Sequence, residues 1–303
     1  MTKHTDIGFI GLGQMGSAMA ERLLGKDFRL HVFDTNAAAV KPFTDGGATA
    51  HDTPKSVADV ASIVFACLPG QKISLDVAFG PQGVIHGKAI EVYVETSTIG
   101  KETIDRIAAT LAERKIGTVD CPVTGGPPVA RAGGLTMLGS GEPANFAAVQ
   151  PLLALIGKNV YHLGDKPGLG QAMKIVNNII MATNVVVAAE GLAFGTKAGL
   201  DAGQMLEILS NGTGQSFACN RIIANGVEGK FNYGASIMIL DKDMTLGMYE
   251  AGVLGAELPV TDRARETWHA AYEAGMGDKD FTAILEWVEK ASGTVVRSGN
   301  PGS

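Results

Sequence analysis

The chain opens with an apolar stretch, a glycine-rich turn and a helix-like stretch, IGFIGLGQMGSAMAERLL, and no other segment constrains the fold as strongly. Three glycines fit the G-x-G-x-x-G pattern of a strand–turn–helix that binds dinucleotides. The first permits a tight turn, the second lets the backbone approach a pyrophosphate, and the third lets the helix pack against the strand. The helix N-terminus then offers N–H groups and a positive dipole end to the phosphates. The residues predicted to bind a dinucleotide here are Gly11, Leu12, Gly13, Gln14, Met15 and Gly16.

A second predicted strand, RLHVFD, ends in Asp34, about twenty residues past the glycines, where a carboxylate binds adenosine ribose hydroxyls. Such a carboxylate repels a 2′-phosphate, and neither Thr35 nor Asn36 supplies a cation to bind one. The sequence therefore favours NAD over NADP as the cofactor. The alternative for Asp34 is that it only caps the next helix.

Strand and helix patterns alternate through the rest of the first half, which predicts a Rossmann-type parallel, doubly wound sheet with helices on both faces. Ligands of such sheets bind at the carboxyl ends of the strands. We therefore assign Leu68, Pro69 and Thr98 to the cofactor crevice, with Ser97 beside them; for Ser97 and Thr98 the alternative is N-capping of the next helix. The predicted helices are 36–46, 54–60, 72–79 and 100–114, and further strands are expected near 48–50 and in SIVFACLPG, EVYVETSTIG and GTVDCPVTGG.

After the linker GDKPGLG, at 164–170, strand patterns largely cease, which predicts that an all-α domain follows. We expect a dinucleotide-binding domain over 1–164, an all-helical substrate and oligomerisation domain over 165–293, and a flexible tail over 294–303. The active site is expected in the cleft between the two domains. The helices predicted in the second half are 171–198, 202–210, 215–228, 237–255, 260–275 and 280–291.

Polar residues interrupt the apolar run GLGQAMKIVNNIIMATNVVV in the first of these helices. Lys174, Asn177 and Asn178 are spaced i, i+3 and i+4, so they share one helix face. Burial of an ammonium costs several kcal/mol unless it is paired, and it favours the neutral amine. A lysine pKa can thereby fall from about 10.4 towards the ~7–8 that suits proton transfer. The alternative is a lysine whose stem follows the helix to the surface.

The run DCPVTGGPPVARAGGL places the hydroxyl of Thr124 beside Gly125 and Gly126 in a proline-bounded turn. Consecutive N–H groups in such a turn form a concavity that suits an anion, here a substrate carboxylate. An ordinary glycine turn is the alternative. Arg131, which follows, either suits a dianionic substrate or is a solvated surface residue.

Four segments, GFIGLGQMG, DCPVTGG with ARAGGL, GLGQAMKIVNN and LDKDMTLG, together resemble the β-hydroxyacid dehydrogenases of the 3-hydroxyisobutyrate dehydrogenase and tartronate semialdehyde reductase type. The resemblance extends over residues 6–292. It implies that Lys174 is the catalytic lysine, that Asn178 helps to bind substrate, and that Lys242 reaches the cofactor. From the residues alone, Lys242 and its acidic neighbour are interpreted as a solvated surface pair. Thr124 stands where the family usually has serine, so the hydroxyl is retained.

The resemblance implies an NAD(P)-dependent oxidoreductase of the EC 1.1.1 type that transfers a hydride between the nicotinamide and the carbinol carbon of a small β-hydroxy acid. Lys174 is then the general acid/base. The identity of the hydroxy acid stays open. One alternative is a non-catalytic nucleotide-binding scaffold, and another is an imine or semialdehyde reductase of the same superfamily. A third is the longer phosphogluconate dehydrogenases, whose pattern looks like K-x-x-H-N; this chain lacks that pattern.

Composition and residue spacing exclude several other classes of protein. The net charge of −6, with no cluster of Lys and Arg, argues against nucleic-acid binding. The three cysteines lie far apart and the six histidines are scattered, so no metal site is expected. The first strand begins at once, and the apolar stretch 175–189 contains three asparagines, so we expect no signal peptide and no membrane span. A cytoplasmic protein is expected, and the resemblance implies a homodimer or homotetramer.

Overall fold

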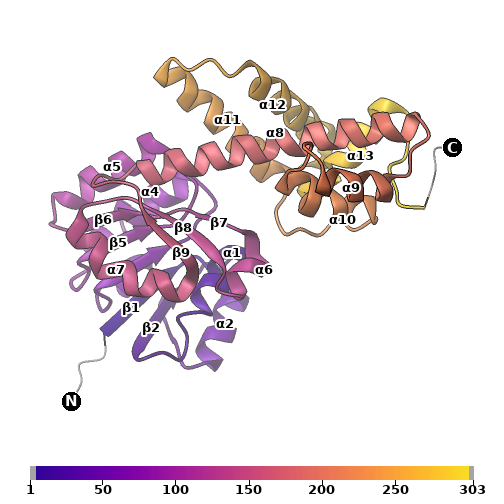
Figure 1. Cartoon of the computed structure of the whole chain (residues 1–303). Helices are drawn as coiled ribbons and strands as arrows, with labels where there is room; N and C mark the ends of the chain where they lie inside the picture. Colours follow the sequence, from indigo (N-terminus) through magenta and orange to yellow (C-terminus); the bar gives the residue numbers. More distant parts are fainter. Residues whose placement is uncertain (1–4, 300–303) are drawn as a thin grey trace. The chain divides into compact units, whose positions relative to one another are not determined.

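The computed structural model of the chain describes residues 5–299. The described chain divides into two compact units, of which the first ends at Lys174 and the second begins at Ile175. The division falls within the longest described helix, α8 (Leu169–Lys197), which begins within the last residues of the predicted linker (Figure 1).

The first unit is built on a six-stranded sheet in which every neighbouring pair of strands is parallel. The strand order is β3-β2-β1-β4-β5-β6, the order of doubly wound dinucleotide-binding sheets. The predicted Rossmann-type sheet is therefore confirmed. Its strands are β1 (Thr5–Ile10), β2 (Phe28–Phe33), β3 (Thr49–Ala50), β4 (Ile63–Ala66), β5 (Val92–Glu95) and β6 (Gly117–Asp120).

Alternate residues of the central strands build a separate core on each face of this sheet. On one face the rings of Phe9 and Phe65 stack with centroids 5.9 Å apart and pack with Met19 of the first helix. On the other face Ile10 packs in the cluster that contains Ile104. Since both faces are covered, the strands are almost continuously apolar. The helices of these layers are α1 (Gln14–Ala20), α2 (Ala37–Asp45), α3 (Pro54–Ala58), α4 (Gln71–Phe79), the 3-10 turn η1 (Val84–His86) and α5 (Lys101–Ala112).

A three-stranded sheet and two helices, largely missed by the sequence analysis, complete the first unit. Strand β9 exposes most of its residues, so its sequence GKNVYH lacks the alternation that identifies a half-buried strand. The predicted turn after Thr124 leads directly into a short helix, α6, with a proline in its first turn, where the missing N–H costs no hydrogen bond. The added elements are β7 (Val123–Thr124), α6 (Gly126–Arg131), β8 (Leu135–Gly139), α7 (Pro143–Ile156) and β9 (Gly157–His162).

All the secondary-structure elements assigned to the described part of the second unit are helices, which confirms the predicted all-α domain. Its core surrounds the fully buried Trp268, whose Nε1–H donates to the carbonyl of Ala182 at 3.2 Å. Besides the rest of α8, the unit contains α9 (Ala202–Asn211), the π-helix η2 (Ala218–Ile223), α10 (Ala224–Val227), α11 (Ile237–Leu254), α12 (Pro259–Ala271), the π-helix η3 (Tyr272–Met276), the 3-10 turn η4 (Phe281–Ala283) and α13 (Ile284–Ser292).

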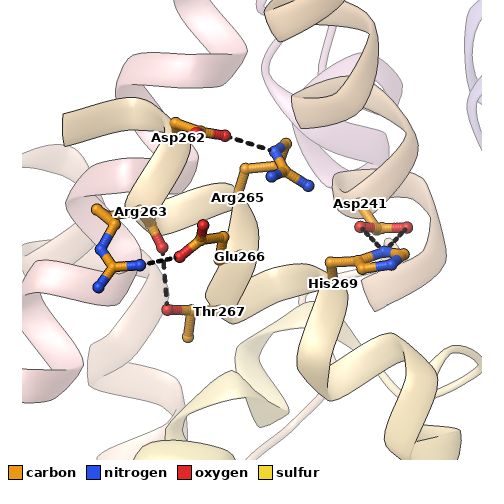
Figure 2. Close-up of polar contacts among 7 residues, drawn as sticks. All are labelled: Asp241, Asp262, Arg263, Arg265, Glu266, Thr267 and His269. Atoms are coloured by element: carbon orange, nitrogen blue, oxygen red, sulfur yellow. Dashed lines mark hydrogen bonds and ion pairs between the residues drawn. The ribbon is translucent and has the colours of Figure 1, made fainter. Parts of the chain in front are cut away.

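The outer face of α12 carries charged pairs (Figure 2). Arg265 donates to Asp262 three residues earlier at 2.8 Å, and His269 lies 3.2 Å from Asp241 of α11. Residues three apart are neighbours on a helix surface. Surface pairs that remain partly exposed contribute at most about 1 kcal/mol each, so we expect these contacts to add little to the stability of the second unit.

The segment predicted as a flexible tail, 294–303, is packed over its described part. Val296 is fully buried and donates its N–H to Glu289 at 2.7 Å. The N–H of Gly299 donates to Asp201 at 2.8 Å. Residues 300–303 lie outside the described part of the chain.

Helix α8 is the one helix among residues 5–299 that is long and apolar enough to cross a membrane, judged by length and composition alone. Its most apolar window has a mean hydropathy of 1.6, and 44% of that window is buried within the structure. A core helix of a water-soluble protein passes the same test.

Candidate active site

The glycine-rich turn has a geometry that two of its glycines require. Gly11 has a φ of +88°, and a Cβ there would lie 2.2 Å from the carbonyl oxygen of Cys67. A Cβ on Gly16 would lie 2.0 Å from the carbonyl oxygen of Gly11, so this glycine lets α1 pack onto the turn. No described atom lies within 4 Å of the Cβ position of Gly13. The first and third glycines are thus needed by the fold, and the second faces open space where the phosphates are predicted.

Asp34 lies just after β2, and its carboxylate accepts hydrogen bonds from two backbone N–H groups. Its Oδ2 accepts from Leu12 at 2.6 Å and its Oδ1 accepts from Asn36 at 2.7 Å. The N–H of Leu12, a predicted cofactor residue, therefore already has an acceptor within the protein. The N-cap of α2 is Asn36, whose side chain accepts from the N–H of Ala38 at 3.0 Å, so Asp34 is not the capping residue. The Asp34 carboxylate instead stabilises the glycine-rich turn through its hydrogen bond from Leu12.

Asp34 also lines an open pocket of about 600 Å³ next to the end of β2, a size within the range of ligand pockets. Lys41 lines the same pocket, with its ammonium 2.8 Å from the carboxylate of Asp45. His51 also lines this pocket; burial lowers its pKa, and the nearby His31 lowers it further. The sequence analysis did not identify Lys41, whose ammonium adds a positive charge to the pocket that also contains the Asp34 carboxylate.

The loops after β4 and β5 are joined through a buried carboxylate. The N–H of Leu68 donates to the hydroxyl of Ser97 at 2.7 Å, and this hydroxyl donates to Glu95 at 2.5 Å. Burial raises the pKa of Glu95, against hydrogen bonds from Ser97 and Tyr93 that lower it. Ser97 thus supports the loop of Leu68, while the N-cap of α5 is Gly100, which has no side-chain cap. The sequence analysis missed Glu95, although a carboxylate inside the apolar strand EVYVE signals a specific partner.

The predicted cofactor residues of the first unit differ in exposure, although they all lie at the carboxyl ends of strands, in the turn after β1 or at the start of α1. Leu68, Thr98 and Met15 are half-buried, and Gln14 and Pro69 are exposed.

The predicted carboxylate-binding turn bends sharply at its two glycines. Thr124, the last residue of β7, is half-buried. Gly125 and Gly126 have φ values of +141° and +78°, in the region that favours glycine. A Cβ on Gly125 would also lie 2.8 Å from a leucine side chain of β8. Arg131 forms an exposed ion pair with Glu21, at 3.6 Å, which agrees with its interpretation as a surface residue.

Asp120, at the end of β6, anchors the first turn of α8. Its Oδ2 accepts from the N–H groups of Gly168 at 3.0 Å and Gln171 at 2.9 Å, and from the hydroxyl of Ser140 at 3.2 Å. A carboxylate at a helix N-terminus is favoured by the helix dipole. Burial nevertheless raises the pKa of Asp120 to about 6, against these hydrogen bonds. The sequence analysis missed this role because the bonded residues of α8 lie about fifty positions further along the chain.

The raised pKa of Asp120 makes a pH-dependent contribution to stability. Since the folded protein binds this proton more tightly than the unfolded chain, the contribution is complete below the unfolded pKa of 3.8 and is lost as the pH rises through about 6. The loss amounts to about 3 kcal/mol. We expect the unfolding free energy of the wild type, relative to Asp120→Asn, to fall between pH 4 and pH 6.5 in denaturant titrations. A difference between the two proteins that does not change with pH would contradict a raised pKa.

Lys174 lies in the second turn of α8, is half-buried and is the last residue of the first unit. Asn177 and Asn178 follow on the same uninterrupted helix and belong to the second unit. Their spacing places the three polar side chains on one helix face, as the sequence predicts.

Asn178 is held by a buried carboxylate of the second unit. Its Nδ2 donates to Asp243 of α11 at 2.7 Å, and its Oδ1 accepts from Asn177 at 3.0 Å. The ammonium of Lys242 lies 3.1 Å from the same carboxylate, which is only 6% exposed. Asp243 is therefore not part of a solvated surface pair, contrary to the interpretation from the residues alone. The sequence analysis overlooked one signal, which is the acidic residue Asp243 within the largely apolar helix α11.

Residues 6–164 match the family described as the NAD binding domain of 6-phosphogluconate dehydrogenase. Residues 168–288 match the family described as NAD-binding of NADP-dependent 3-hydroxyisobutyrate dehydrogenase. The chain is also 36% identical over 302 residues to 2-(hydroxymethyl)glutarate dehydrogenase of Eubacterium barkeri, across 99% of this chain and 100% of that relative. The chain belongs to the β-hydroxyacid dehydrogenase family.

Solved structures of similar proteins agree with this membership. A 3-hydroxyisobutyrate dehydrogenase of Salmonella typhimurium superposes with a TM-score of 0.85 at 27% identity, over 93% of this chain and 99% of that one. Psf3, solved in complex with NADP+ and 2-OPP, superposes with a TM-score of 0.85 at 26% identity over the same shares of the two chains. As a β-hydroxyacid dehydrogenase, the protein is an NAD(P)-dependent oxidoreductase that acts on CH–OH groups, so the predicted enzyme class is confirmed.

Proposed function

We propose that this dehydrogenase transfers a hydride between NAD and the carbinol carbon of a small β-hydroxy acid, with Lys174 as the general acid/base. The observation that carries the proposal is the polar face of α8, where Lys174 and Asn178 stand one turn apart in a largely apolar part of the helix. Asn178 has a fixed orientation because Asp243 accepts from its amide.

NAD, when bound, supplies the hydride acceptor for oxidation of the alcohol. Lys174, in its neutral form, accepts the hydroxyl proton as the hydride leaves, and in the reverse direction its ammonium returns that proton to the forming alkoxide. A primary amide has two N–H groups and two acceptor sites. Beyond its bonds to Asp243 and Asn177, Asn178 therefore has one N–H and one acceptor site with which to bind the substrate.

The turn after β7 is the proposed site of the substrate carboxylate. Thr124 contributes a hydroxyl, and the N–H groups of Gly125 and Gly126 are consecutive in a bend that only glycine adopts without strain. An anion held there keeps the alcohol end of a short β-hydroxy acid free for Lys174.

NAD is the proposed cofactor because the Asp34 carboxylate lines the pocket at the end of β2 and disfavours a 2′-phosphate. Lys41 lines the same pocket, and its positive charge would favour a 2′-phosphate, but that charge is offset by the carboxylate of Asp45. The open space at Gly13 and the uncapped start of α1 fit the pyrophosphate.

The proposal is tested with a panel of β-hydroxy acids that carry a methyl, hydroxymethyl, carboxyl or carboxyethyl substituent on the α-carbon. Each acid is mixed with enzyme and with NAD or NADP, and the absorbance of the reduced nicotinamide is followed. We expect turnover of at least one acid, with kcat/KM at least about tenfold higher for NAD, a difference of about 1.4 kcal/mol. A flat trace across the panel from protein that binds NAD would exclude these substrates, and turnover with NADP alone would overturn the cofactor assignment.

Two further expectations from the sequence stay predictions. A homodimer or homotetramer is supported by large apolar side chains exposed at seven-residue spacing along α8, Ile180, Val187 and Phe194. A cytoplasmic location is supported only by the sequence.

A further inference from the structure

Gln171 is a fully buried polar side chain in the first turn of α8, and its amide makes four hydrogen bonds. Its Oε1 accepts from the N–H groups of Ile99 at 2.8 Å and Gly100 at 2.9 Å. Its Nε2 donates to the carbonyl of Ser97 at 3.0 Å and to Asp120 at 2.8 Å. These four bonds use every donor and acceptor site of the amide, so its orientation is determined.

The four bonds join three segments that are far apart in the sequence. One partner is the carboxylate at the end of β6, and the other partners lie in the loop between β5 and α5, which contains the predicted cofactor residue Thr98. The amide itself stands on α8. Gln171 therefore connects a loop of the proposed cofactor site directly to the helix that carries Lys174.

The first turn of α8 has little freedom to rotate against the sheet. A Cβ on Gly170 would lie 2.4 Å from the carbonyl oxygen of Leu138, so the helix backbone is in direct contact with β8. The N–H of Gly170 donates to Ser140 at 3.0 Å. Lys174 follows Gln171 by three residues, so the two side chains are neighbours on the helix surface. A rotation of this turn would redirect both side chains together.

We propose that Gln171 is a positioning residue that sets the direction of the Lys174 amine relative to the loop between β5 and α5. This inference rests on the proposed role of Lys174 in proton transfer. Gln171 touches neither substrate nor cofactor in this scheme. It acts because its four hydrogen bonds fix the helix that carries the base to the loop of the predicted cofactor residue Thr98. A misplacement of a catalytic group by about 1 Å can lower a rate by about 10²-fold.

The test is a double-mutant cycle between Gln171→Met and Lys174→Ala. Methionine has a similar length and volume to glutamine but cannot make the four bonds. In the presence of Lys174 we expect Gln171→Met to lower kcat by about 10- to 100-fold, with less than tenfold change in the Kd for NAD. In the Lys174→Ala background the same substitution is expected to lower the residual kcat by less than about threefold, because the group that it positions is gone.

A purely structural role predicts a different pattern, in which Gln171→Met lowers kcat by the same factor in both backgrounds. That result, or a Gln171→Met enzyme with wild-type kcat, overturns the positioning role while leaving the role of Lys174 intact. If Lys174→Ala alone keeps a near-normal kcat, the proposed proton transfer fails and the positioning role fails with it. The two failures are therefore distinguishable.

Ser140→Ala is the milder second variant if Gln171→Met does not fold. It removes one hydroxyl from the same anchor and leaves Gln171 in place, and we expect a kcat reduction of about three- to tenfold, again lost in the Lys174→Ala background. A wild-type kcat for Ser140→Ala would then overturn the proposal. Thr118→Val is the matched control on β6, because the buried hydroxyl of Thr118 has no hydrogen-bond partner among the described residues. Its kcat is expected to equal that of the wild type.

Discussion

Lys174→Ala is expected to lower kcat by about 10²- to 10⁴-fold, the usual contribution of a general acid/base, while the Kd for NAD changes by less than about threefold. The rate falls because no group on α8 then accepts the hydroxyl proton. NAD binding is retained because the glycine-rich turn and Asp34 lie on other elements of the first unit. Steady-state kinetics measure kcat, and displacement of fluorescent NADH by NAD measures the Kd for NAD.

Two further lysine variants sharpen this result. Lys174→Arg keeps the positive charge but replaces the amine with a guanidinium that cannot be deprotonated in proteins, so we expect it to be as slow as Lys174→Ala. Lys197→Ala is the control on the same helix, since Lys197 is exposed and, within residues 5–299, donates only to the carbonyl of Ser292 at 2.6 Å. Its kcat is expected to stay unchanged. A fast Lys174→Arg enzyme would show that the charge, and not proton transfer, is what position 174 supplies.

Gly11→Ala is expected to destabilise the first unit by about 3 kcal/mol or more and to weaken NAD binding at least about tenfold. A non-glycine residue at positive φ costs about 1–2 kcal/mol, and here the added Cβ would also lie 2.2 Å from a backbone carbonyl oxygen that cannot rotate away. The melting temperature should fall by about 6–12 °C, since 1 kcal/mol corresponds to about 2–4 °C in a domain of this size. Thermal unfolding with and without NAD measures both effects.

Gly25→Ala is the matched control for this substitution. Gly25 also has a positive φ, +70°, but no described atom lies within 4 Å of its Cβ position. We therefore expect only the conformational cost of about 1–2 kcal/mol and an unchanged Kd for NAD. Equal destabilisation in the two variants would show that the contact with the Cys67 carbonyl contributes nothing.

The features that the sequence predicted correctly depend on short spacings. The G-x-G-x-x-G turn lies between one strand and the next helix, and the polar face of α8 repeats over one helical turn. Likewise, the alternation of strands and helices predicted the parallel sheet, because each pattern is complete within about ten residues. The sequence analysis missed β9 because an edge strand with mostly exposed residues has no such pattern.

The partners of the buried polar groups depend on residues far along the chain. Asn178 meets Asp243 across 65 positions, and Gln171 meets Asp120 across 51. No local period encodes these pairs, since a carboxylate is buried only where distant N–H groups converge on it. The sequence by itself therefore determined the fold class of both domains, and it also determined the glycine-rich turn and the helix face that carries Lys174. Only the tertiary structure decided that Asp34 braces the turn, that Glu95 and Asp120 are buried, and that Gln171 ties α8 to the sheet.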